Sequence, residues 1–482
     1  ASNNVAVGTS ALTANSSGTD NVAVGDSAGD AVTTGSDNTL IGDNSGGALT
    51  TGDDNVAIGS GALLVATTVS DMTAVGSAAL TANTTGTANT AVGYNAGLAV
   101  TTGANNTALG YQSLKTATTT SGNTAVGENA LRDCTGTENT ALGSSAMYDG
   151  AGGTENVAVG NDALIVNAGN ENVSIGGDSM KANTTGANNV AVGYAALDAN
   201  TTADQNTAVG GNALTANTTG SNHVAVGYNA LAGNTTAHYN TAVGHQALET
   251  NSTGASNTAI GTEALEANTT AANNTAVGAK ALEANTTGTS NVAVGATALD
   301  ANTTADNNTA VGYAALTANT TGTGNVAVGE SALGANTTGN YNIAIGDEAG
   351  AALVSGTENT FMGFLSGRYT GSSDHPDYNT GIGSRALYAN TTGENNVAVG
   401  AYSLAANTTA NNNTGIGYGA LQVNTTGTFN VAVGAFALDA NTTAQQNTGV
   451  GYNALSANTT GASNTAFGSL ALDANTTANY NT

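Results

Sequence analysis

The sequence has few of the residues on which most enzymes and nucleic-acid-binding proteins depend. Only 8% of its 482 residues are charged, and 33 acidic residues stand against 6 basic ones, which gives a net charge of −27. Because neutralising a phosphate backbone needs clustered Lys and Arg, we expect no nucleic acid partner. The single cysteine, Cys134, excludes a disulfide within the chain, and we expect it to be a small buried hydrophobic residue.

Long apolar runs, aromatic residues and catalytic motifs are also scarce. Aromatics make up 4% of the chain and Trp is absent. No run approaches the roughly 18 apolar residues of a membrane helix, so we expect no membrane insertion in this segment. The four histidines (His223, His238, His245 and His375) are scattered, and no glycine motif of the phosphate-binding kind follows a strand. We therefore expect no catalytic residues, no cofactor, no metal ligands and no enzyme activity.

What the chain has in abundance is one repeated motif. Asn-Val-Ala-Val-Gly returns almost unchanged along the whole sequence, and the asparagines that open three successive copies, Asn308, Asn325 and Asn342, are 17 residues apart. Between Gly8 and Gly468 this period gives about 28 copies. Each copy has only a few small apolar side chains to bury, so a single copy cannot fold alone.

The first part of each repeat has the pattern of a β-strand. In the copy that opens at Asn189, alternation places Val190 and Val192 on one face and Ala191 on the other. The second motif position varies between Val and Thr, whereas the fourth stays Val, Ile or Leu, so we expect the fourth to be more deeply buried. A helix is the competing interpretation. The Gly, the paired Thr and the several Asn of every repeat oppose it.

The remainder of the repeat completes one coil of a solenoid. We expect Leu197 to be a second apolar anchor on a short second strand or extended segment. Gly193 and Asn200 suit corners, because both residue types tolerate positive φ. The predicted fold is all-β: a parallel β-solenoid, or β-roll, of about 28 coils with one 17-residue repeat per coil. Equivalent asparagines then stack in columns that hydrogen-bond to one another.

A strand that is apolar on both faces, in a coil one chain thick, needs a partner for one face. The simplest partner is another copy, which makes a homo-oligomer. A monomeric solenoid wide enough to bury both faces is the alternative. We place the face of Ala191, Ala208 and Ala225 at the contact between copies.

The strand motif resembles the head repeats of trimeric autotransporter adhesins. The copies with Ile, Asn55–Gly59 and Asn342–Gly346, come closest to their Val-Ala-Ile-Gly strands. The resemblance implies a left-handed β-roll, a trimer and an extracellular setting. Arrays of Asn-Thr-Ala-Val-Gly-Tyr-x-Ala-Leu are also similar to the shafts of bacteriophage tail fibres and of large bacterial surface proteins. The repeat here is longer than the usual adhesin head unit.

Breaks in the period mark the first candidate site. We predict a single continuous domain over 1–482, with irregular coils at 127–176 and an insertion loop at 364–379. The loop could bind a ligand or a cation, or it could be a tolerated surface excursion. Its candidate ligand residues are Arg368, Tyr369, Asp374, His375 and Asp377.

The Asn-Thr-Thr segments form a second candidate site, because each is an acceptor pattern for N-glycosylation. The alternative is a structural corner. The candidate residues are Asn183, Asn200, Asn217, Asn234, Asn268, Asn285 and Asn302. An ice-binding threonine face is less favoured, because adjacent residues of an extended chain point to opposite sides.

The 17-residue register also predicts which charges are neighbours. Lys181 should pair with Asp198, and Glu263 with Lys280. An acidic column should lie on the outer surface, where its members repel one another or hold cations. Its residues are Glu249, Glu266, Glu283 and Asp300.

Together these patterns favour a structural extracellular fibre or adhesin shaft that projects a tip from a cell or virion surface. The alternative is a glycan- or surface-binding adhesin that uses the solenoid faces, on which Tyr194 and Tyr228 project from alternate coils. An ice-binding protein is a weaker alternative. Surface glycans are therefore the one further partner that the sequence suggests.

Overall fold

The computed structural model describes residues 1–369 and 376–482. All regular secondary structure in these residues is β-strand. Packing divides the chain into two compact units, Ala1–Tyr239 and Asn240–Thr482. The all-β parallel solenoid is confirmed, whereas its handedness and the single continuous domain remain predictions.

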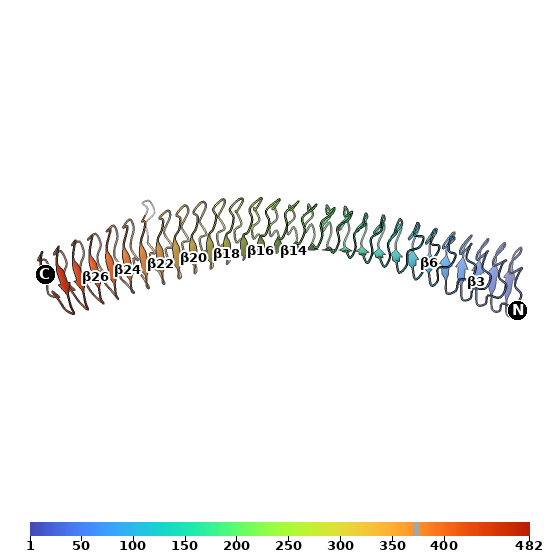
Figure 1. The fold of residues 1–482 in the computed structure, drawn as a ribbon, viewed down its shortest axis with the longest axis horizontal. Helices are drawn as coiled ribbons and strands as arrows, with labels where there is room; N and C mark the ends of the chain where they lie inside the picture. The colour runs from blue at the N-terminus through green and yellow to red at the C-terminus, as the bar shows by residue number, and fades with distance from the viewer. Residues whose placement is uncertain (370–375) are drawn as a thin grey trace. The chain divides into compact units, whose positions relative to one another are not determined.

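Every strand is three residues long, and Figure 1 shows the strands of each unit following one another in chain order. The first unit contains β1 (Val5–Val7), β2 (Val22–Val24), β3 (Thr39–Ile41), β4 (Val56–Ile58), β5 (Thr73–Val75), β6 (Thr90–Val92), β7 (Thr107–Leu109), β8 (Thr124–Val126), β9 (Thr140–Leu142), β10 (Val157–Val159), β11 (Val173–Ile175), β12 (Val190–Val192), β13 (Thr207–Val209) and β14 (Val224–Val226). The second unit contains β15 (Thr241–Val243), β16 (Thr258–Ile260), β17 (Thr275–Val277), β18 (Val292–Val294), β19 (Thr309–Val311), β20 (Val326–Val328), β21 (Ile343–Ile345), β22 (Thr360–Met362), β23 (Thr380–Ile382), β24 (Val397–Val399), β25 (Thr414–Ile416), β26 (Val431–Val433), β27 (Thr448–Val450) and β28 (Thr465–Phe467).

Neighbouring strands pair in parallel with the register of the repeat. Val192 of β12 faces Val209 of β13, as the 17-residue spacing predicts. The breaks in the period do not disturb this register. Thr124 pairs with Thr140 across the one-residue deletion, and strand pairing also continues from β22 to β23 across the insertion. Deletions and insertions are therefore absorbed outside the strands.

The middle residue of each strand is the one that points into the coil. Ala191 is completely buried, whereas Val190 and Val192 are only half-buried. The expectation that the fourth motif position would be more deeply buried than the second was therefore wrong, because both lie on the outer side of the strand. A coil made of one 17-residue repeat is too narrow for two large side chains facing each other, so Ala faces inward and the β-branched residues face outward.

Exceptions to the small middle residue are compensated across the coil. Phe361 occupies the middle position of β22 and is fully buried. Gly350 and Gly367 lie beside it, at the position where most coils have a buried Leu. A Cβ added at Gly367 would lie 2.5 Å from the Phe361 ring. Large and small residues thus exchange places while the interior volume is conserved.

The Leu that most coils bury at this position lies on a turn and not on a second strand. Leu197 is fully buried, as expected for the second apolar anchor, but its φ is 53°. The expected second strand or extended segment is therefore wrong, because left-handed residues break the extended conformation there. Gly193 has the expected positive φ, 142°, whereas Asn200 does not.

Asn200 instead belongs to one of two buried columns of asparagine. Its Nδ2 donates to Asn183 Oδ1 of the preceding coil at 2.8 Å and to Ala203 O of its own coil. In the second column, the backbone N–H of Asn206 donates to the side-chain Oδ1 of Asn189 at 3.0 Å. The predicted hydrogen-bonded columns are confirmed. They satisfy the backbone groups that such an irregular interior leaves unpaired.

Apolar residues interrupt the column to which Asn200 belongs. Cys134 occupies this position in one coil, and the prediction that it is a small buried residue is confirmed. Burial raises the pKa of its thiol. In the same column, Asn83 stands between Ala66 and Val100, so it has no asparagine above or below it.

We expect Asn83→Val to stabilise the protein by about 1 kcal/mol. Asn83 is fully buried, and neither Nδ2 nor Oδ1 has a hydrogen-bond partner among the described residues. Valine already fills the equivalent position in the next coil, Val100, and it removes two unpaired polar atoms from the interior. The matched control, Asn200→Val, should instead destabilise by about 1–3 kcal/mol, because it breaks a continuous column. Thermal unfolding of both variants measures the difference, and equal effects would contradict this account of the columns.

Candidate functional site

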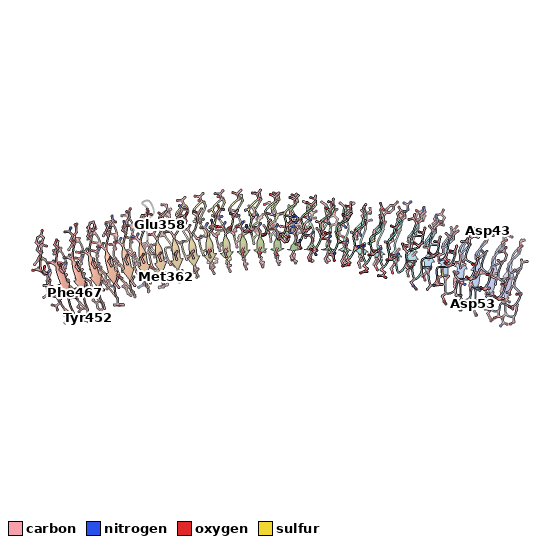
Figure 2. All side chains as sticks on the ribbon, in the orientation of Figure 1. Asp43, Asp53, Glu358, Met362, Tyr452 and Phe467 are labelled. Carbon is pink, nitrogen blue, oxygen red and sulfur yellow. The ribbon has the colours of Figure 1, made fainter. Side chains whose placement is uncertain are left out.

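The outward face of the strands is a continuous row, mostly of Val, Ile, Leu and Thr side chains, in each unit. It consists of the first and third residues of every strand, which are the second and fourth positions of the motif. In the second unit, Ile260, Val294 and Ile345 are 41%, 37% and 37% exposed. Figure 2 places Met362 on this strand side of the coil and Glu358 on the opposite side. We call these columns the outward strand face.

The position of this face corrects the predicted contact between copies. Ala191, Ala208 and Ala225, which we expected at the contact, are fully buried inside the coil. They cannot meet another copy without opening the coil. If copies associate through the strands, the contact is made by the outward strand face. On this face, a column made mostly of Val, Ile and Leu lies beside a column made mostly of Thr and Val.

At the insertion loop, the structure brings only some of the predicted residues together. Arg368 forms an ion pair with Glu348, and its guanidinium lies 4.9 Å from the centre of the Tyr369 ring. Tyr369 meets Tyr388 edge to face, with ring centres 4.9 Å apart. A hydrogen bond between these two tyrosines raises the pKa of Tyr369 and lowers that of Tyr388. Asp374 and His375 lie outside the described residues.

Asp377, the last predicted loop ligand, has a structural contact. Its Oδ1 accepts a hydrogen bond from the Thr357 amide at 2.7 Å. Asp204 and Asp306 accept the same bond from Ala187 and Thr289 in regular coils. Asp377 therefore continues a contact that recurs along the solenoid and is not specific to the loop.

The side chains of the Asn-Thr-Thr asparagines lie inside the coil. All seven candidate residues are fully buried, and the Nδ2 atom that would carry a glycan donates to the neighbouring coil or to its own. This geometry contradicts glycosylation of the folded coils and favours the corner alternative, because a glycan on Nδ2 would displace the column. The residues concerned are Asn183, Asn200, Asn217, Asn234, Asn268, Asn285 and Asn302.

The predicted charge register is confirmed at one pair. Lys280 Nζ lies 2.9 Å from Glu263, as expected, and also 2.9 Å from Glu283. These hydrogen bonds raise the pKa of Lys280. Lys181 Nζ, in contrast, lies 2.7 Å from Asp178. Its expected partner, Asp198, contributes only through its negative charge, which helps to raise the pKa of Lys181.

The acidic column lies on the surface with partly exposed side chains, as expected. Partial burial is the main cause that raises the pKa of Glu266, and the negative charges of the neighbouring glutamates raise it further. The carboxylates of Glu263, Glu266 and Glu283 come within 4.8 Å of one another. Within this group, Lys280 forms ion pairs with Glu263 and Glu283.

Three residues that the sequence analysis missed lie beside the insertion: Arg385, Tyr388 and Tyr402. The repeat register could have identified part of this group, since Arg385 and Tyr402 are 17 residues apart and therefore equivalent on adjacent coils. Two tyrosines of the first unit are more exposed. Tyr194 and Tyr228, which we expected to project outward, are 65% and 53% exposed.

No model of a known protein family matches this chain, and no curated protein is similar to it in sequence. Among the described residues, none forms a helix with the length and apolar character that a bilayer crossing requires.

Proposed function

We propose that the protein is a structural extracellular shaft in which several copies associate side by side and hold a tip away from a cell or virion surface. The outward strand face is the single observation that carries this proposal, because a continuous exposed row of apolar side chains marks an interaction surface. The extracellular setting rests on the resemblance of the repeats to surface and tail fibres. The number of copies, three by that resemblance, is part of the proposal.

Stiffness along the axis comes from hydrogen bonds between successive coils. Besides the strand ladder, Leu197 N donates to Ala213 O at 3.0 Å, and Ala199 N donates to Thr215 O at 3.0 Å. The two asparagine columns run in the same direction. Bending a coil away from its neighbour would break many of these bonds at once, so the fold suits a load-bearing spacer.

Side-by-side association needs an apolar contact that does not spread into aggregation. The net charge of −27 is dispersed over the surfaces away from the strands, where like charges keep separate particles apart. The apolar residues of the outward strand face lie on one side of the coil, so a closed ring of copies covers that face.

Light scattering on the purified chain tests this proposal. We expect the measured mass to be a fixed multiple of the chain mass, greater than one, that does not change on dilution through the micromolar range. A monomer at micromolar concentration would overturn the proposal, because the outward strand face would then be stable without a partner.

Direct binding of a glycan or surface is the second candidate function, and the exposed tyrosines favour it. Tyr94 and Tyr111 stack on adjacent coils with ring centres 5.5 Å apart. Such ring pairs offer flat apolar faces to a sugar. A glycan array separates this candidate from the shaft, which requires no ligand.

A further inference from the structure

A cavity of about 310 Å³ opens on the surface of the second unit, lined by Arg385, Tyr388, Tyr402 and Ala405. This volume lies within the range of small-molecule sites. Arg385 and Tyr402 are equivalent residues of successive coils, and so are Tyr388 and Ala405. Two neighbouring coils therefore build the whole site.

The cavity exists because one side chain in a column is short. The fifth residue after the glycine that closes each strand lies on this surface. It is Tyr388 in one coil, Ala405 in the next and Gln422 in the third. Since Ala405 has only a methyl group, the space beside the Tyr388 and Tyr402 rings stays open.

Arg385 is held against both rings and has donors to spare. Its guanidinium carbon lies 5.9 Å from the centre of the Tyr388 ring and 5.6 Å from that of Tyr402, and Nη1 donates to the Tyr402 hydroxyl at 3.1 Å. Within the described part of the chain, no carboxylate lies within 4.0 Å of it. Arg368 and Arg132, in contrast, each contact an acidic residue.

This combination selects for the chemistry of its ligand. A guanidinium with open donors binds a carboxylate through two parallel hydrogen bonds. The tyrosine rings present apolar faces to C–H groups. Tyr388 is fixed edge to face by Tyr369, so the site is ordered before a ligand arrives.

We propose that this cavity binds a carboxylated sugar unit, such as a hexuronic acid residue of a surface polysaccharide. The carboxylate accepts hydrogen bonds from Arg385, and the C–H face of the sugar ring lies against Tyr388 and Tyr402 in the space above Ala405. The shaft would then bind glycan at one defined position along its length.

Saturation-transfer NMR and calorimetry with methyl β-glucuronide test the proposal, with methyl β-glucoside as the neutral probe. Wild-type protein should bind the glucuronide about tenfold or more tightly than the glucoside. Arg385→Gln should remove that preference. Ala405→Gln, which places in the cavity the side chain found at position 422, should abolish binding of both sugars while Arg385 stays in place.

Arg132→Gln is the matched control, because Arg132 also lies over a tyrosine ring, at 5.0 Å from the centre of Tyr148, but does not line the cavity. It should leave glucuronide affinity unchanged. Failure of the wild-type protein to bind glucuronide at millimolar concentration would overturn the proposal. So would equal losses in the Arg132 and Arg385 variants, or inorganic phosphate competing as well as the sugar. None of these results bears on the mass of the particle, so the shaft proposal is tested separately.

Discussion

Gly193→Ala should destabilise the coils around β11 to β13 by about 3 kcal/mol. Gly193 has φ 142°, a conformation that residues with a Cβ rarely adopt. A Cβ built there would lie 2.5 Å from the oxygen and 2.6 Å from the carbonyl carbon of Gly210 on the next coil. Both atoms belong to backbone, so neither can rotate away. Hydrogen exchange of the amides in these strands, followed by mass spectrometry, measures the effect.

Gly177→Ala is the control for this prediction. Gly177 belongs to the preceding coil, but the nearest atom to its added Cβ is a Tyr194 ring carbon at 3.7 Å, an ordinary contact. We expect its exchange rates to match those of the wild-type protein. Equal protection in the two variants would mean that successive coils are not stacked as closely as the structure describes.

The triple variant Ile260→Glu, Val294→Glu and Ile345→Glu should convert the assembled particle into monomers. These side chains are partly exposed in one chain, so the coil itself can accommodate Glu. Between copies, the same carboxylates would be buried without partners, and the dissociation constant should rise about a thousandfold or more. Sedimentation velocity gives the change in mass, and circular dichroism reports whether the coil is retained.

The matched control places three Glu residues at exposed corners of the same unit. The substitutions are Thr270→Glu, Thr287→Glu and Thr304→Glu, at positions that the structure leaves exposed. They add the same charge but should leave the assembly intact. Dissociation by the control, or persistence of the assembly in the strand variant, would exclude the outward strand face as the contact.

The sequence was sufficient to predict the coil and its register. Equivalent residues 17 apart, such as Val192 and Val209, could be placed on adjacent parallel strands because any other spacing would misalign the columns. Burial was harder to predict. Val190, Ala191 and Val192 are all apolar, so alternation separates the two faces but does not say which one points inward. The narrowness of the coil decides this, and it depends on the position of Leu197 across the interior.

The candidate sites show the same limit. Asn200 fits a glycosylation pattern in the sequence, but only the structure shows its amide inside the coil. The cavity at Arg385 depends on Ala405, and an alanine gives no signal in a sequence so rich in alanine. Lys181 binds Asp178 of its own coil because that carboxylate is closer than the one on the next coil. Such choices depend on side-chain conformation and not on spacing.

The central claim, that the chain is a shaft built from one coil per repeat, is tested most directly by changing the number of repeats. Ten tandem copies of the 17-residue segment 308–324, inserted after Gly324, restart the motif correctly at Asn325. Electron micrographs should show particles of unchanged width that are longer by about 48 Å, since parallel strands are about 4.8 Å apart. Particles that grow in width, or whose length does not change, would contradict the account.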